Sequence, residues 1–192
     1  LRTSYGAQGS GGGSSTESAI TLSNGTYTIT VGAGGASVNN STDYQARGNA
    51  GSNSTITGNA SVSTNGGGAP GSNNLLASSG GGCGGGQGAH PSSARSAQAG
   101  TTGEGYPGGA TPSVGHPYRG GGGGGTGQAG FSNNAGSDTS DGGDGLAVSI
   151  TGSSVNYGAG GGGTGGTGSG YTGAGGSGGA GGGGNGGAYN GS

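Results

Sequence analysis

Residues 173–181 read Gly-Ala-Gly-Gly-Ser-Gly-Gly-Ala-Gly, so that the non-glycine residues Ala174, Ser177 and Ala180 recur at every third position. Three residues per turn is the repeat of the polyproline-II type of helix, which has no internal hydrogen bonds. The backbone groups of such a helix must therefore pair with neighbouring segments. Only glycine lets backbones approach that closely. The stretch predicts a bundle of short antiparallel polyglycine-II helices joined by turns.

The same period extends outward from this stretch. Thr164 and Thr167 keep it earlier in the chain, and Asn185 and Ala188 keep it later. We expect polyglycine-II tracts near 80–88, 120–130 and 158–188. Collagen is excluded, because the triplet is broken repeatedly and the chain has only 5 prolines. A flexible Gly-Ser linker is the competing interpretation, but a linker needs no phase.

Composition limits how large an apolar core can be. Glycine supplies 63 of 192 residues, 24% of residues are hydrophobic, and 5% are charged. Disordered chains also lack apolar residues, but they usually carry high net charge, and this chain carries only −2. Order must come mainly from backbone hydrogen bonding.

The same numbers exclude several functional classes. All four cationic residues are arginines spread along the sequence, so we expect no nucleic-acid partner. Cys83 is the sole cysteine, which rules out an intrachain disulfide. The apolar stretches are too short for membrane insertion. Because the sequence begins with Leu1 rather than Met, we expect a processed product or one segment of a longer polypeptide.

Three places have the alternating pattern of β-hairpins, near residues 20–31, 55–63 and 146–157. In the first, Asn-Gly at positions 24–25 is the preferred two-residue turn. The resulting register pairs Leu22 with Tyr27 and Ile20 with Ile29.

The other two hairpins have longer loops. The second pairs Ile56 with Val62, and the third pairs Ile150 with Val155 and Val148 with Tyr157. Together the three predict a small β core.

The predicted fold class is therefore all-β or irregular: a small β-hairpin core with stacked polyglycine-II helices and no α-helix. Residues 19–192 are expected to form a single glycine-rich domain. Residues 1–18 are interpreted as a Gly/Ser-rich lead-in or linker.

Two blocks of sequence carry a resemblance to a known family. The first is residues 25–36 with residues 48–54, and the second is residues 142–145 with residues 149–158 and the tract 160–163. Both resemble the glycine-rich domain that is widespread in phage tail fibres and large-virus proteins, and with their tracts they cover most of residues 19–188. Two features of the family are missing: the strand block that opens such domains, and the strand that closes them.

The resemblance implies a function. The sequence resembles the glycine-rich adhesins at the fibre tips of T-even-type phages, which stack polyglycine-II helices and display variable loops. By this fold-level analogy we expect a distal tail-fibre adhesin, in the virion or otherwise extracellular, that contacts a host cell-surface glycan or protein receptor. The chain is then a homo-oligomer or part of a larger fibre. Two alternatives stay open: an extracellular filament subunit, and an ice-binding (antifreeze) protein, which the breaks in phase disfavour.

The segment from Ala89 to Arg119 is comparatively poor in glycine. Tyrosine and arginine are frequent binding anchors, and loops on a rigid scaffold are where recognition occurs. A mobile connector is an equally open interpretation. The residues predicted to bind a receptor are His90, Arg95, Tyr106, His116, Tyr118 and Arg119.

No enzyme is expected. Matches to G-x-G-x-x-G arise by chance in this composition, and a Walker A loop needs the lysine that the chain lacks. The spacing of Cys83 from the histidines supports no catalytic site, and we expect no cofactor and no resident metal. Asp138, Asp141 and Asp144 recur every third residue and are a weak calcium candidate. A solvated acidic loop is the preferred interpretation, because no known calcium loop matches.

Overall fold

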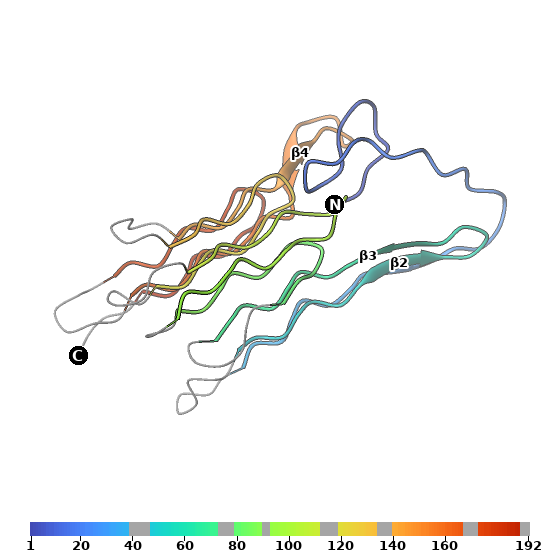
Figure 1. The fold of residues 1–192 in the computed structure, drawn as a ribbon. Coiled ribbons are helices and arrows are strands. Elements are labelled where there is room, and N and C mark those ends of the chain that lie inside the picture. The colour runs from blue at the N-terminus through green and yellow to red at the C-terminus, as the bar shows by residue number, and fades with distance from the viewer. Residues whose placement is uncertain are drawn as a thin grey trace.

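The computed structural model describes residues 1–38, 47–72, 79–89, 93–111, 119–133, 140–166 and 173–188. Within these ranges the chain forms short strands and no helix, so the all-β or irregular fold class is confirmed. Extended segments lie side by side along most of the molecule (Figure 1). In the described part of the chain, no helix has the length and apolarity to cross a membrane.

The glycine tracts hold one another by backbone hydrogen bonds at every third residue. In the tract 173–180, Gly176 and Gly179 donate to the carbonyls of Gly163 and Gly160, at 2.9 and 3.0 Å. The residues between them donate elsewhere, so successive N–H groups point at different neighbours. One tract therefore bonds to several others at once.

The same spacing recurs across the bundle. Gly84 and Gln87 donate to the carbonyls of Tyr106 and Gly109, at 3.0 and 3.1 Å, so these two tracts run parallel. The tracts 120–124 and 160–164 run antiparallel, as expected. Because the first pair is parallel, the expectation of antiparallel helices is wrong for part of the bundle. A spacing of three is what polyglycine-II helices require, and the helix type itself stays a prediction.

Glycine is needed at the positions whose α-carbon faces the backbone of another tract. A Cβ at Gly176 would meet the carbonyl oxygen of Ser140, and one at Gly179 would meet that of Gly143, both well inside the 3.0 Å that real Cβ atoms essentially never breach. Both glycines are buried, whereas Ser177 between them is exposed. The predicted division into neighbour-facing glycines and outward-facing small residues is confirmed.

Two small antiparallel sheets flank the tracts. The first joins strands in the order β1 (Thr28–Thr30), β2 (Ser54–Thr57) and β3 (Val62–Thr64). The second pairs β4 (Leu146–Val148) with β5 (Val155–Tyr157).

The middle predicted hairpin is confirmed and the first is wrong. Ile56 pairs with Val62 as expected. Ile29, however, pairs with Ile56 rather than with Ile20, which lies outside any strand. Strand β2 thus replaces the predicted local partner of β1. In this arrangement β2 forms hydrogen bonds along both of its edges, to β1 and to β3.

The third hairpin exists in a different register. Val148 pairs with Val155, and Leu146 pairs with Tyr157. The loop is longer than expected because Gly152, at φ 93°, closes a turn by donating to the carbonyl of Ser149 at 2.9 Å. A shift of two residues keeps each side chain on its predicted face.

The predicted apolar core is wrong. Among the described residues the buried hydrophobic side chains are Ala69 and Val148, while Ile29 and Val31 are 70% and 82% exposed. The strands are only three or four residues long, and the two sheets lie apart from each other (Figure 1). Their apolar faces therefore do not pack together. Backbone contacts fill the interior instead.

Residues 1–18, interpreted from the sequence as a lead-in or linker, bond to the tracts. Gly12 donates to the carbonyl of Thr126 at 3.0 Å, and the amino group of Leu1 donates to the carbonyl of Glu104 at 2.6 Å. Arg2 forms an ion pair with Glu17 at 2.6 Å. This segment covers one end of the bundle, which we call the near end.

Candidate functional site

Several tracts finish at the same level at the opposite end, which we call the far end. Gly121 donates to the carbonyl of Gln87 at 2.8 Å, and Gly109 donates to that of Gly122 at 2.6 Å. This register places Thr111 and Arg119 together where their tracts end. The described segments stop on this side of the molecule, away from the N terminus (Figure 1).

Buried polar side chains tie the far end together. Thr111 is 1% exposed and exchanges two backbone hydrogen bonds with Arg95, both 2.9 Å. The Gln87 side chain donates to the carbonyl of Ser96 at 2.8 Å. Asn133 is buried and donates to the carbonyl of Arg119 at 3.3 Å. The described tract ends are therefore held to one another by these side chains and by backbone hydrogen bonds.

The described arginines other than Arg2 lie at one end, whereas carboxylates lie at both, since Asp141 is one residue from the far-end limit of its tract. Arg95 and Arg119 lie at the far end, and the 8% exposure of Arg119 shows that much of its side chain is packed. Arg47 also lies there, because the antiparallel bonds of residues 33–36 with residues 49–52 run toward it. Glu17 and Glu104 lie at the near end. Asp43 and Asp138 fall outside the described residues.

The structure does not unite the predicted receptor-binding residues. Tyr106 lies near the near end, where its hydroxyl would be 2.7 Å from a Cβ built at Gly13. Its N–H donates to the carbonyl of Gly125 at 2.9 Å. Arg119 precedes Gly125 by six positions, or about 19 Å of extended chain at roughly 3.1 Å per residue. Arg95 and Arg119 share the far end, and Tyr106 does not.

The remaining predicted residues, His90, His116 and Tyr118, lie outside the described residues. The described neighbours on either side of each, such as Ala89 and Thr111, belong to the far end.

The two described aspartates of the calcium candidate have a different use. Asp141 accepts a hydrogen bond from the N–H of Ser177, and Asp144 accepts one from the N–H of Ala180, both at 2.7 Å. Asp138 lies outside the described residues. The aspartates are three residues apart, as are the N–H groups of Ser177 and Ala180 in the neighbouring tract. The two carboxylates therefore act as acceptors for that backbone.

Reactive side chains do not converge within the described ranges. No group of three or more His, Cys, Asp and Glu residues could hold a metal there. Burial raises the pKa of the Cys83 thiol, so the sulfur is protonated and weakly nucleophilic at neutral pH.

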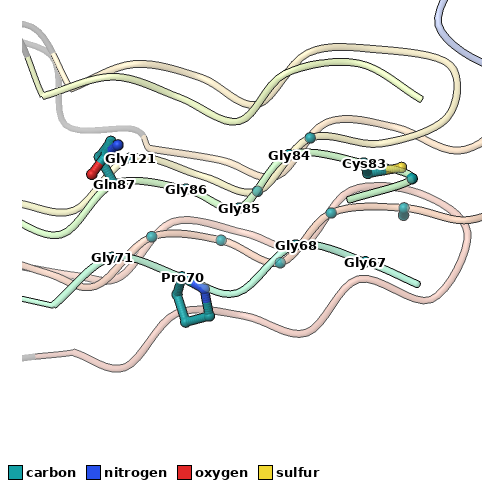
Figure 2. A pocket seen from close by; sticks show the side chains of 18 of the residues that line it. Gly67, Gly68, Pro70, Gly71, Cys83, Gly84, Gly85, Gly86, Gln87 and Gly121 are labelled. Atoms are coloured by element: carbon teal, nitrogen blue, oxygen red, sulfur yellow. The ribbon is translucent and has the colours of Figure 1, made fainter. Parts of the chain in front are cut away.

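A cavity of about 560 Å³ lies among four tracts. Figure 2 shows residues 67–71 running alongside residues 83–87, and residues 120–124 and 158–164 line the rest of its length. The lining also includes Leu1, Asn65, Glu104 and Thr126. Glycine supplies most of this lining, and the labelled side chains other than glycine are Pro70, Cys83 and Gln87. Sequence reasoning missed this groove. The available signal was the unbroken glycine run from 120 to 125, where no position carries a side chain.

Comparison with known proteins places the chain in context. A family model described as a glycine-rich domain matches residues 2–192. The match includes the segment that covers the near end. No curated protein and no solved structure matches the chain.

Proposed function

Because the chain belongs to the glycine-rich domain family, we propose that it is a non-enzymatic binding module of a tail fibre whose far end contacts a host-surface receptor. Its tracts are polyglycine-II helices, and their role is to hold the far end rigid. The receptor is a cell-surface glycan or a protein that presents anionic groups.

The observation that carries this proposal is the position of the arginines along the bundle. Arg47, Arg95 and Arg119 lie at the far end, and Arg2 lies at the near end. Arginine binds carboxylate, sulfate and phosphate groups through paired donors. Recognition usually sits where a rigid scaffold presents its connecting segments.

The hydrogen-bond pattern supports the scaffold part of the proposal. Packed polyglycine-II helices must exchange bonds with several neighbours at a spacing of three. The tract 173–180 bonds in this way to the tracts that contain Gly163, Asp141 and Asn185. Such a framework needs few side chains, which leaves the others available for binding.

The test compares two sets of substitutions. Arg47→Ala with Arg95→Ala should weaken attachment of labelled protein to receptor-bearing cells by about tenfold or more for each residue, since anchor residues typically contribute about 2 kcal/mol each. The melting temperature should stay nearly constant. Arg2→Ala is the matched control, because it removes an arginine from the near end and should leave attachment unchanged.

Undiminished attachment of a folded Arg47→Ala, Arg95→Ala variant would contradict a far-end receptor site. An equal loss in the Arg2→Ala control would do so as well, because it would point to net charge rather than position.

A further inference from the structure

The groove is bounded by a curved row of bonded tracts. Residues 67–71 bond to residues 82–88, these bond to residues 120–124, and these in turn bond to residues 158–164. The cavity lies inside this row, so the two outer tracts form its walls and the two middle tracts form its floor.

The size of the groove fits one extended chain. Seven residues of extended chain span about 22 Å at roughly 3.1 Å per residue. With neighbouring chains about 4.8 Å apart, one chain in such packing fills roughly 400 Å³ over that length. The cavity of about 560 Å³ is therefore large enough to hold one extended chain.

One wall presents unused backbone donors at the spacing of a tract. The N–H groups of Gly161 and Thr164 have no acceptor in the described part of the chain, although the carbonyls of both residues are bonded. A Cβ built at Gly123 would lie 3.3 Å from the nitrogen of Gly161, and one built at Gly120 would lie 3.4 Å from that of Thr164. These nitrogens thus lie beside the glycines that line the floor. Donors three residues apart match the carbonyls of another tract.

The tract 183–188 presents an edge of bare glycines. Gly184 and Gly187 are exposed, and a Cβ built on either would meet nothing within 4 Å. Neither has a positive φ, so the fold of the molecule itself does not require glycine at these positions. Their carbonyls accept bonds from Gly162 and Gly165, but their N–H groups find no acceptor among the described residues.

We propose that the edge tract 183–188 of one copy of this chain occupies the groove of a second copy. Close packing surrounds a rod with six equal rods. The edge tract bonds to two tracts of its own molecule, those containing Gly163 and Gly176, and the groove supplies the other four. Bare glycines on both surfaces are then covered, as a sheet edge is covered when a strand is added. The N–H groups of Gly161 and Thr164 would donate to edge-tract carbonyls other than those of Gly184 and Gly187, which are already bonded.

This contact goes beyond receptor binding and does not depend on it. Groove and edge are different surfaces, so each copy has one of each and the contact joins unlike patches. The test can therefore distinguish self-association from receptor binding.

Two variants block one surface each. Gly184→Val with Gly187→Val alters the edge, and Gly67→Leu fills the groove. Built Cβ atoms at these positions meet nothing within 4 Å, so each variant should fold. Ala174→Val with Ser177→Val is the matched control on exposed positions of another tract.

Sedimentation velocity over a wide concentration range is the measurement. Wild-type protein and the control should associate, and each blocked variant alone should associate at least tenfold more weakly. An equimolar mixture of the edge variant and the groove variant should form a heterodimer, since it retains one intact edge and one intact groove. A monomeric wild type, a groove variant that associates normally, or a mixture that stays monomeric would overturn the proposal.

A peptide experiment covers the case in which a variant fails to fold. An excess of a peptide with the sequence of residues 182–188 should dissociate the wild-type assembly. The same peptide with valine at positions 184 and 187 should not. Equal effects of the two peptides would also overturn the proposal.

Discussion

At the scale of single residues, the tracts divide glycines into those that the neighbouring backbone requires and those that it does not. Gly176 and Gly179 belong to the first kind, and Gly184 belongs to the second. The chemical identity of the residue is the same, and the difference lies in what faces its α-hydrogen. Substitution by a larger residue should therefore disrupt folding at Gly176 or Gly179 and be tolerated at Gly184.

We expect Gly176→Val or Gly179→Val to abolish folding, because the added carbons would displace the backbone of residues 140–143. Ser177→Thr should leave the free energy of unfolding within about 0.5 kcal/mol of wild type, since its side chain is exposed. Thermal melts followed by circular dichroism measure both. Similar melts for all three variants would mean that the tracts are not in backbone contact.

Asp144 gives a second prediction at this scale. Asp144→Ala should destabilise the protein by about 1 kcal/mol, because the N–H of Ala180 loses its acceptor at a partly solvated position. Asp144→Asn should retain most of the stability, since the amide oxygen can still accept. Added calcium should leave the melting temperature of wild type unchanged. A calcium-dependent rise would restore the metal interpretation of these aspartates.

At the scale of elements, the sequence predicted best where the pattern is local and repeated. The period of three in residues 173–181 anticipated which residues face outward, and the loop between β2 and β3 fixed the pairing of Ile56 with Val62. The Asn-Gly turn at 24–25 failed because Ile29 found a partner far along the chain. Pattern reasoning has no means to weigh a local turn against a distant strand.

The candidate site was predictable only in part, for a related reason. Arginine and tyrosine between Ala89 and Arg119 were singled out by residue type, but residue type does not give the level of a residue along a tract. Tyr106 and Arg119 are separated by most of the length of one tract, which only the hydrogen-bond register reveals.

The near-end segment makes a prediction about pH. The Arg2 guanidinium lowers the pKa of Glu17 below the ordinary value of 4.5. The stabilisation from this ion pair is therefore complete above about pH 4.5, and it is lost as the pH falls through the lowered pKa. Because the pair is exposed, the loss should be only about 0.2–1 kcal/mol.

Denaturant melts of wild type and Glu17→Gln between pH 6 and pH 2 provide the measurement. The difference in unfolding free energy should shrink as the acid protonates Glu17. A difference that is constant with pH would show that the ion pair does not stabilise the near end.

At the scale of the whole molecule, the interior consists of backbone rather than of apolar side chains. Unfolding should therefore expose mostly peptide groups. Exposed apolar surface raises the heat capacity, and exposed polar surface lowers it. We expect a heat-capacity change of unfolding well below the usual figure of about 12–15 cal/mol/K per residue.

Scanning calorimetry measures this quantity directly. A value in the ordinary range would indicate that apolar side chains such as Ile29 and Val31 are buried in solution.

The orientation of the tracts also has a mechanical consequence. Leu1 lies at the near end, whereas the tract 183–188 runs toward the far end, since Gly187 bonds beside Gly165. Tension applied between these two points acts along the tract axis and across the direction of the hydrogen bonds. Many bonds then share the load in shear and must break together, whereas a sideways pull would open them one after another. The molecule is thus suited to transmit force lengthwise between whatever is attached to its two ends.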